Sequence, residues 1–557
     1  MRTIVPVIDL FAGPGGLGEG FSSYRPEGRI NRAFKILLSV EKDVWAHQTL
    51  ELRSFFRQFS REVPDSYYEY ARRAITRDEL FARHPVQALD ARDEAMHAEL
   101  GVHDELIYAR LSRQLTKLPD RNWLLVGGPP CQAYSVIGRA RRRASSETDV
   151  RQVLYQEYLK ILARFQPAAF VMENVKGLLS SQARLDASAK PHATGPQELI
   201  FARILRDIKR PVRAVRETEP GWNRRLHLSD VTYRIYSLVV PCTDPDQIPP
   251  EDFVIRSEDY GVPQTRHRII LLGVRGDIDQ RPGTLTPHPG GRIAVEDVIE
   301  GLPALRSQLS KRKDQDRDSP QSWQHAILRM REASWLHNPV GTPTPTQLKL
   351  FTNGELNDCR TQELTQSICQ SMNSVLVHNC IGGEFMPGAY RRPAYRSDWY
   401  FDPRLRGVCN HISRAHMVSD LHRYMFLSCY AEVHGTSPTM WQIPPGLRPL
   451  HKNVQEWDPA DPDQPFDDRF RVQVRGKPAT TITCHIAKDG HYNVHYDPRQ
   501  CRSLTVREAA RIQTFPDNYI FEGPRTQQYQ QVGNAVPPLL ANQIAAIVYD
   551  LFDRIHE

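Results

Sequence analysis

The chain has 557 residues, of which 40% are hydrophobic and 25% are charged. This length allows two or three domains with a substantial core, and the composition is that of a soluble globular protein. We therefore expect a cytoplasmic protein that is neither secreted nor bound to a membrane, and nine cysteines without paired spacing indicate reduced thiols. The net charge of +7 is mildly basic, so it permits a nucleic-acid partner without requiring one.

The amino-terminal stretch predicts a turn that binds a nucleotide-like cofactor. The run from Ile4 to Phe11 is rich in β-branched residues and predicts a strand, and the glycine-rich segment after it, Gly13 to Gly18, matches G-x-G-x-x-G. A second apolar run ends just before Glu41, whose carboxylate would accept hydrogen bonds from ribose hydroxyls. The motif by itself fits a dinucleotide and S-adenosylmethionine equally well.

Cys131 follows an abrupt stop in an apolar run. The stretch from Trp123 to Val126 predicts a buried strand, and two glycines and two prolines separate it from Cys131. Prolines stiffen the backbone while glycines allow close approach of another molecule, so the thiol is a candidate nucleophile. The alternative is a buried structural cysteine.

Two further stretches carry charged side chains at strand ends. Phe170 to Val175 predicts a buried strand that presents Glu173 to the ligand crevice of a parallel sheet. Arg266 and Arg268 precede the strand Ile269 to Val274, and because side chains alternate along a strand we expect both on one face. The alternative for the arginines is an exposed basic edge strand.

A basic cluster lies downstream of Cys131, in a stretch with glycine and serine that predicts a loop. It is either a solvated surface loop or a set of phosphate clamps that closes over a polyanion. The cysteines and histidines of the middle region contain no C-x-x-C pair, so we expect no metal site. The arginines of the cluster are Arg139, Arg141, Arg142 and Arg143.

Taken together, six blocks in this order resemble the cytosine-C5 DNA methyltransferase family of bacterial restriction-modification and phage-defence systems. They lie at both ends of the chain and leave much of the middle unmatched. The blocks are Asp9-Leu10-Phe11-Ala12-Gly13-Pro14-Gly15-Gly16, Pro130-Cys131-Gln132, Glu173-Asn174-Val175, Gln264-x-Arg266-x-Arg268, the stretch 504–516, and Gln531-Val532-Gly533-Asn534.

The resemblance implies a chemistry that needs these residue types. Cytosine C5 is a poor nucleophile, so the Cys131 thiolate would first add at C6 and make the ring an enamine able to attack a methyl sulfonium. Glu173 in its protonated form would hydrogen-bond N3, and Arg266 and Arg268 would hold the base carbonyl and the charges of the site. A stacked base is out of reach, so the cytosine would have to be flipped out of the duplex.

The resemblance also implies S-adenosylmethionine as the cofactor and double-stranded DNA as the partner, bound by a monomer, with a cognate restriction or defence protein as a further partner. The cofactor-binding residues it implies are Phe11, Ala12, Gly13, Gly15, Gly16, Leu17, Glu41, Pro130 and Asn534, and the DNA-binding residues are Gln132, Arg139, Arg141, Arg142 and Arg143.

The expected architecture is a doubly wound, Rossmann-like α/β methyltransferase domain with an inserted target-recognition domain. The catalytic domain spans 1–281, with insertions at about 53–111 and 181–225; the recognition domain spans 282–500, and 501–557 complete the catalytic domain. The first insertion departs from the family pattern at the acidic residue that contacts the adenine amino group, for which Asp90 is the candidate.

Three alternatives remain at this point. An RNA cytosine methyltransferase of the same fold would share the chemical residues, although the long middle region favours duplex DNA. A nicotinamide oxidoreductase explains Gly13 to Glu41 but leaves Cys131 and Glu173 without a role. A catalytically silent DNA-binding protein is disfavoured because every residue that the chemistry needs is present.

Overall fold

A computed structural model describes residues 4–60, 62–120, 122–130, 150–184, 197–219, 221–222, 228–242, 244–310, 318–337, 358–375, 380–449 and 469–555. Cys131, Gln132 and the arginines at 139, 141, 142 and 143 lie outside the described residues.

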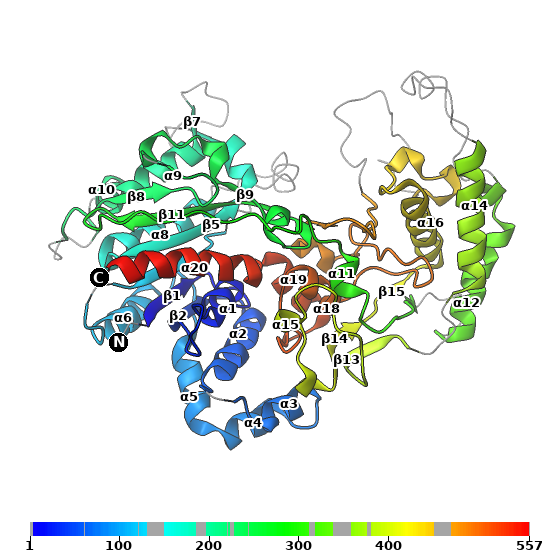
Figure 1. Ribbon diagram of the computed structural model, residues 1–557, viewed down its shortest axis with the longest axis horizontal. Helices are drawn as coiled ribbons and strands as arrows, with labels where there is room; N and C mark the ends of the chain where they lie inside the picture. The colour runs from blue at the N-terminus through cyan, green and yellow to red at the C-terminus, as the bar shows by residue number, and fades with distance from the viewer. Residues whose placement is uncertain are drawn as a thin grey trace.

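An eight-stranded sheet forms the centre of the part of the protein that contains residues 1–281 and 501–557 (Figure 1). We call this part the catalytic half because the catalytic domain is expected there. Its order is β3-β2-β1-β4-β5-β11-β8, with β9 paired to β11 outside this path. The strands from β3 to β5 are parallel, whereas β11 runs antiparallel to its neighbours. The strands are β1 (Val5–Leu10), β2 (Phe34–Glu41), β3 (Ala95–His97), β4 (Leu124–Gly127), β5 (Ala169–Val175), β8 (Tyr233–Tyr236), β9 (Val254–Arg256) and β11 (His267–Arg275).

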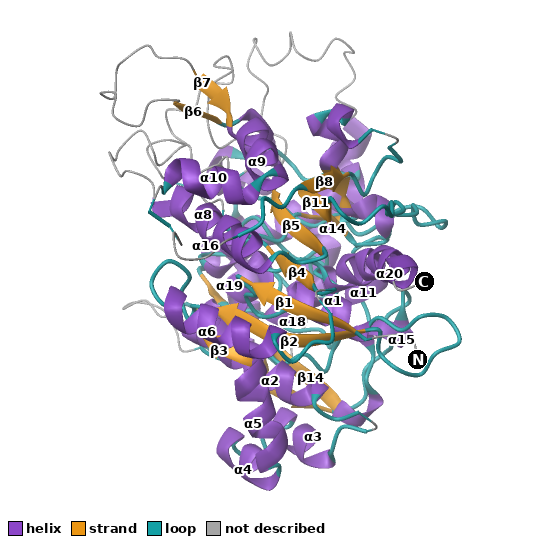
Figure 2. Ribbon diagram, turned by 90° about the vertical axis from the view of Figure 1, so that its left-hand side faces the viewer, coloured by secondary structure: helices purple, strands orange, loops and turns teal. Residues whose placement is uncertain are grey.

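Helices cover both faces of this sheet, as a doubly wound α/β fold requires. Figure 2 shows one helix group on each side of the strands. One apolar core lies under α6 (Asp104–Leu115), α8 (Val150–Phe165), α9 (Ile200–Lys209) and α10 (Pro211–Thr218), and the other lies under α1 (Gly16–Ser23) and α20 (Pro538–Ile555). The predicted fold class is therefore confirmed.

The last helix closes the sheet although it comes from the other end of the sequence. Residues Arg525–Ile555 are long and apolar enough to cross a membrane, but 72% of their most apolar window is buried inside the protein. Gly20 of α1 allows the close contact with α20, since a Cβ at this position would lie 2.3 Å from the Cβ of Ala541. The apolarity of α20 therefore reflects burial in the core of the catalytic half.

A lobe with its own core stands beside the catalytic half, at the right of Figure 1. It is built mainly from α12 (Pro320–Leu328), α14 (Asp358–Asn373) and α16 (Val418–His434). Its core includes the fully buried Trp323, Tyr424 and Phe426. We call this part the recognition lobe because it lies mainly within residues 282–500, where a target-recognition domain is expected.

A further core joins the two halves. It combines residues 293–302 with the carboxyl-terminal helices α18 (Val506–Ile512) and α19 (Arg525–Asn534). The short turn η10 (Cys484–Ala487) and the hairpin of β13 (Gly382–Pro387) and β14 (Gly407–Ile412) pack against these helices. The region 282–500 therefore contributes to more than one core.

Within the stretch 53–111, part of the chain belongs to the central sheet. β3 pairs with β2, and α6 covers one face of the sheet. The helices that leave the sheet are the end of α2 (Val44–Arg57), α3 (Asp65–Ala71), α4 (Arg77–Arg83) and α5 (Pro85–Glu94).

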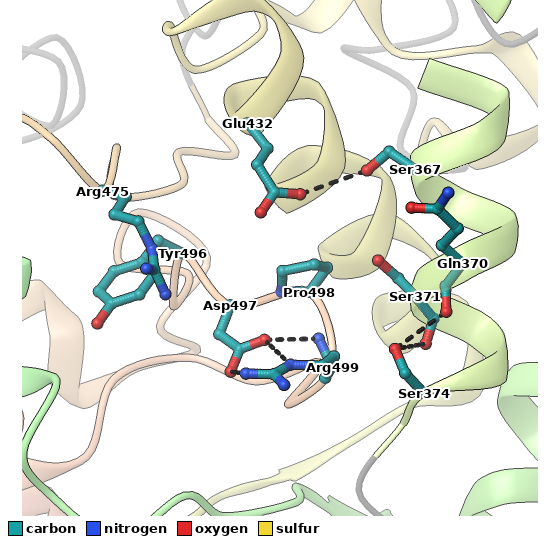
Figure 3. Close-up of a pocket in the computed structure, with 10 residues that line it drawn as sticks. All are labelled: Ser367, Gln370, Ser371, Ser374, Glu432, Arg475, Tyr496, Asp497, Pro498 and Arg499. Carbon is teal, nitrogen blue, oxygen red and sulfur yellow. Dashed lines mark hydrogen bonds and ion pairs between the residues drawn. The ribbon is translucent and has the colours of Figure 1, made fainter. Parts of the chain in front are cut away.

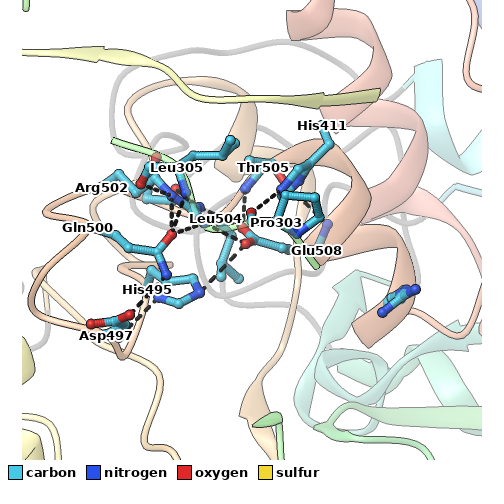
Figure 4. A network of polar contacts seen from close by, with 12 residues as sticks. Pro303, Leu305, His411, His495, Asp497, Gln500, Arg502, Leu504, Thr505 and Glu508 are labelled. Carbon is cyan, nitrogen blue, oxygen red and sulfur yellow. Dashed lines mark hydrogen bonds and ion pairs between the residues drawn. The ribbon is translucent and has the colours of Figure 1, made fainter. Parts of the chain in front are cut away.

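A buried polar network fixes α18 at the junction (Figure 4). The guanidinium of Arg502 donates two hydrogen bonds to the Glu508 carboxylate, at 2.7 and 2.6 Å, and Glu508 also accepts the backbone amide of Thr505 at 2.7 Å. His411 lies 2.8 Å from both the Thr505 hydroxyl and the Pro303 carbonyl. Because these elements come from stretches about a hundred residues apart, the network ties the hairpin β13–β14 to the carboxyl-terminal segment.

The histidines of this network are held neutral. His411 is fully buried, and burial lowers its pKa to about 4. His495, whose Nε2 lies 3.5 Å from Glu508 Oε1, has its pKa lowered to about 4 by burial and by the charge of Arg502. The Glu508 carboxylate already accepts hydrogen bonds from Arg502 and the Thr505 amide, so a protonated histidine beside it would gain little additional electrostatic stabilisation.

We predict that stability falls as the pH drops below about 6.5, the usual pKa of a histidine in an unfolded chain. Between about pH 6.5 and 4 the unfolded chain binds protons that His411 and His495 do not bind in the folded protein, so acid favours unfolding by on the order of 1–3 kcal/mol per histidine. Thermal unfolding of the wild type and of His411→Gln from pH 8 to 5 measures this.

The variant His411→Gln should show a shallower loss of melting temperature with falling pH. The control is His325→Gln, which removes an exposed histidine on α12 and should retain the wild-type slope. Equal slopes for wild type and His411→Gln would contradict the assignment of a neutral buried histidine.

Candidate active site

Glu173 and Arg268 form an ion pair on neighbouring antiparallel strands. Glu173 lies on β5 opposite Ile270 of β11, and Arg268 lies opposite Val175, two positions along on the same face of the pair. The Nε of Arg268 is 2.9 Å from Glu173 Oε1, and the side chains are 16% and 15% exposed. The site therefore contains a carboxyl group that is oriented by a cation and still accessible.

The other oxygen of Glu173 points to the turn that leads to Cys131. A Cβ at Gly128 would lie only 3.0 Å from Glu173 Oε2, so the carboxyl group lies close against the backbone of this turn. β4 ends at Gly127 beside β5, and the half-buried Pro130 is the last described residue before Cys131. The thiol itself lies outside the described residues, but the chain is described to within one residue of it.

The alternation of side chains predicted that Arg266 and Arg268 share one face of a strand. The structure shows that they do not. It lies between β10 (Gln264–Thr265) and β11, and its side chain is buried. Its guanidinium donates to the carbonyls of Ile482, at 2.9 Å, and Gly533, at 3.3 Å. Burial, and then the charge of Arg268, lowers the pKa of Arg266 to about 9. In this structure Arg266 joins parts of the chain rather than facing an open site.

Gln264 likewise joins distant parts of the chain. Its amide nitrogen donates to the Ile512 carbonyl and to the Gln513 side chain, and its oxygen accepts the Ile482 amide at 3.1 Å. The buried hub formed by Gln264, Arg266 and Gln513 therefore brings η10 and the end of α19 to the edge of β11. Of the three motif residues, Arg268 alone pairs with Glu173.

The glycine turn after β1 is held open by Glu41. The Gly13 amide donates to Glu41 Oε2 at 2.8 Å, and the Asp43 amide donates to Oε1 at 2.7 Å. Phe11 and Gly13 have positive φ values of 55° and 58°, and a Cβ at Gly13 would meet no atom within 4 Å. Burial raises the pKa of Glu41 despite these amide bonds. The turn thus has open space beside it and a carboxylate at its rim.

The next glycines serve packing. A Cβ at Gly15, where φ is +98°, would lie 2.9 Å from the Tyr519 hydroxyl, and a Cβ at Gly16 would lie 2.3 Å from the Val536 carbonyl oxygen. The side chain of Leu17 is buried in the core under α20, and Ala12 packs against Leu50. These residues position the turn, and their backbone is what can face a cofactor.

The carboxyl-terminal segment reaches the glycine turn through Tyr519 and, at Gly16, through Val536. The Tyr519 hydroxyl donates to the Pro14 carbonyl. Asn534 is exposed at the end of α19, next to Gly533, whose close packing against Thr483 and Cys484 requires a glycine. Tyr519 lies three residues after the block 504–516 and belongs to no motif, so sequence analysis did not identify it as a site residue.

For an acidic residue at the edge of β3, the structure favours Glu99 over Asp90. Asp90 lies on the exposed side of α5, before β3 begins. Glu99 follows β3 after Ala98, at the end of the strand where His97 pairs with Glu41 of β2, and it accepts a hydrogen bond from Lys42 at 2.9 Å. The sequence could have indicated Glu99 only by its position after a short strand. That strand is difficult to recognise because many of the residues around it are charged.

A separate polar cavity of about 220 Å³ lies in the recognition lobe, between α14 and the loop 496–499 (Figure 3). None of its lining residues is among the predicted site residues. They are Ser367, Gln370, Ser371, Ser374, Glu432, Arg475, Tyr496, Asp497, Pro498 and Arg499.

The two arginines should give different variants. We predict that Arg268→Ala lowers kcat for the expected methyl transfer by about 100-fold or more, because it removes the cation that orients Glu173, with a smaller loss of stability than the change at Arg266. Arg266→Ala should instead lower the free energy of unfolding by about 2–4 kcal/mol, because it breaks buried charge-assisted hydrogen bonds. Chemical denaturation and single-turnover assays separate these effects. Full kcat in Arg268→Ala would refute the assignment.

Comparison with known proteins agrees with this geometry. The family model described as C-5 cytosine-specific DNA methylase matches residues 109–189 and 252–549. The chain is 30% identical over 570 residues to Type II methyltransferase M.Bpa9945I of Bacillus paralicheniformis, covering 99% of this chain and 100% of that protein. It is 24% identical to Type II methyltransferase M.AgeI of Thalassovita gelatinovora, covering 97% and 98%.

A third relative is the DNA (cytosine-5-)-methyltransferase M.ApeKI of Aeropyrum pernix, 24% identical over 458 residues, which covers 78% of this chain and 82% of that protein. A family model that matches more than half of the chain is incompatible with a nicotinamide oxidoreductase. The paired Glu173 and Arg268, the open glycine turn and these matches lead to one conclusion: the chain belongs to the C-5 cytosine-specific DNA methylase family and is a DNA (cytosine-5-)-methyltransferase.

Proposed function

We propose that this enzyme methylates a flipped-out cytosine in duplex DNA through a covalent adduct between Cys131 and C6. The observation that carries the proposal is the Glu173–Arg268 pair, with Oε1 of Glu173 bonded to Arg268 and Oε2 beside Gly128, three residues before Cys131. A thiol and a proton donor at the two sides of one pyrimidine are what addition at C6 requires.

The proposed reaction proceeds from these groups. The Cys131 thiolate forms a bond to C6 while N3 takes a proton from Glu173 Oε2, so the negative charge does not remain on the ring. Arg268 keeps Oε1 paired, which leaves Oε2 as the oxygen that exchanges the proton. After C5 has received the methyl group, C5 loses its proton to a base, N3 returns its proton, and the bond between C6 and the thiolate breaks.

S-adenosylmethionine, the proposed cofactor, supplies the methyl group on an electrophilic sulfonium when it is bound. The glycine turn supports this choice: the space beside Gly13 is open, and Glu41 still has acceptor capacity for ribose hydroxyls after accepting two backbone amides. Phe11, Pro130 and Glu99 follow the ends of the parallel strands β1, β4 and β3, so they lie at the same edge of the sheet. Asn534, at the end of α19, is the proposed contact for the methionine end of the cofactor.

The proposed substrate is double-stranded DNA read by residues 282–500, with the recognition lobe as the principal reader. Gln132 and the arginines at 139, 141, 142 and 143 would contact DNA, in the latter case through phosphates. We propose a role in a restriction-modification or phage-defence system, acting as a monomer in the cytoplasm, because the relatives reported above include Type II methyltransferases.

A 5-fluorocytosine-containing duplex tests the covalent step. Fluorine at C5 cannot leave as a proton does, so wild-type enzyme with S-adenosylmethionine should form an adduct that survives denaturation, and Cys131→Ser should form none. Cys242→Ser, which changes a cysteine that bonds only the nearby Asp244 carbonyl, is the control and should trap normally. Trapping by Cys131→Ser would refute the mechanism.

Exchange of residues 282–500 for the equivalent segment of another family member tests where DNA is read. We expect the methylated sequence to change while Cys131 and Glu173 still perform the reaction, because base contacts specify and phosphate contacts do not. Genome-wide bisulfite sequencing of cells that express the chimera gives the result. An unchanged methylation site would place the reading residues elsewhere.

A further inference from the structure

Residues 282–500 meet the catalytic half at several places, including the core shared with α18 and α19. One lies near the active site, where β10 pairs with β16 (Ala479–Thr480) and Arg266 bonds the Ile482 carbonyl. Another lies where α3 meets the hairpin β13–β14 and the segment between its strands. Domains move relative to one another by default, so each such attachment restricts that motion.

The contacts at α3 are polar and specific. The Tyr68 hydroxyl donates to Asp402 Oδ2 at 2.8 Å, and the guanidinium of Arg404 lies 4.3 Å from the centre of the Tyr68 ring. Arg72 donates to the Arg404 carbonyl at 2.9 Å, and Arg404 pairs with Asp65 at 2.7 Å. Helix α3 therefore bonds both the backbone and the side chains of the segment between β13 and β14.

An apolar core supports these contacts. Leu405 and Cys409 are buried against the aromatic residues of α2 and α3, and the Cys409 thiol donates to the Ala71 carbonyl at 3.6 Å. Residues of α3 also contact the catalytic half: the Tyr67 hydroxyl donates to the Asn518 carbonyl at 2.9 Å, and the Tyr70 hydroxyl donates to Glu522 Oε1 at 2.6 Å. Successive tyrosines of one helix thus hold two different parts of the chain.

The hairpin leads directly into the recognition lobe. β14 ends at Ile412, β15 (Ala415–His416) pairs with β12 (Gln308–Leu309), and α16 begins at Val418. The ring of His416 packs against Tyr424 of α16, with centroids 4.9 Å apart. Only a few residues therefore connect the hairpin to the core of the recognition lobe.

We propose that α3 is a brace that sets the angle between the recognition lobe and the catalytic half, with Tyr68 and Arg404 as its positioning residues. The brace holds the lobe at the orientation in which DNA is bound, so that less binding energy is needed to fix it. The inference rests on the proposed role of residues 282–500 in reading DNA.

Two neighbouring tyrosines provide a matched test. Tyr68→Phe removes the bond to Asp402 on the lobe side, whereas Tyr70→Phe removes an equivalent bond to Glu522 within the catalytic half. For Tyr68→Phe we expect KM for a cognate duplex to rise about five- to tenfold, as the loss of one hydrogen bond to a carboxylate implies, with kcat and the Kd for S-adenosylmethionine unchanged. Tyr70→Phe should leave KM for DNA unchanged.

A second variant and a second measurement keep the test decisive. Arg404→Gln combined with Tyr68→Phe should raise KM further, and small-angle X-ray scattering of the DNA-free protein should give a larger radius of gyration than wild type or Tyr70→Phe. Melting temperatures of both single variants show whether stability alone accounts for the effect. An unchanged KM in the double variant, or the same rise in Tyr70→Phe, would overturn the brace.

The two proposals fail differently. If exchange of residues 282–500 leaves the methylated sequence unchanged, the role of that segment in reading DNA fails. If the exchange changes the sequence but Tyr68→Phe and Tyr70→Phe act alike, the brace alone fails.

Discussion

The buried guanidinium of Arg266, bonded to the carbonyls of Ile482 and Gly533, is the interaction on which the arrangement of the site depends. A guanidinium is costly to bury without hydrogen bonds, and the Nη1 group of Arg266 donates to both carbonyls, which offsets part of this cost although the buried Nε has no partner among the described residues. One carbonyl follows β16, and the other precedes Asn534 at the end of α19. A single side chain therefore holds in register two segments that the sequence places far apart.

Around this interaction, one short motif contains side chains in different environments. Arg268, like its partner Glu173, is partly exposed, whereas Arg266 and Gln264 are buried and bond to distant parts of the chain. The break between β10 and β11 causes the difference, because it removes the alternation that would have placed both arginines on one face. The glycine turn shows the same division, with Gly13 beside open space and Gly16 packed under Val536.

The carboxyl-terminal segment contacts both the glycine turn and Arg266. It supplies α20 to one face of the sheet, Tyr519 to the Pro14 carbonyl, and the Gly533 carbonyl to Arg266. The network of Arg502, Glu508 and His411 joins this segment to the hairpin β13–β14, and α3 bonds that hairpin from the other side. The catalytic half and the recognition lobe are thus linked through buried polar groups, which are sensitive to geometry because an unpaired one is costly.

The sequence by itself determined the fold class, the family and the residue types of the site. Strand and helix patterns are local, and the blocks around Gly13, Glu173 and Arg268 each place a functional group at a strand end, where period-two alternation and turn chemistry are readable without tertiary contacts. The assignment of Cys131 also comes from the sequence alone and stays a prediction, because Cys131 lies outside the described residues.

Tertiary structure decided what each polar residue of those blocks touches. Whether Arg266 faces a ligand or two carbonyls depends on segments more than two hundred residues away. The position of Glu99 rather than Asp90 at the sheet edge, and the docking of α3 on the hairpin, depend likewise on β3 pairing with β2 and on Asp402 lying beside Tyr68. Such long-range pairings are set by packing and by the need to satisfy buried polar groups, and no local pattern in the chain records them.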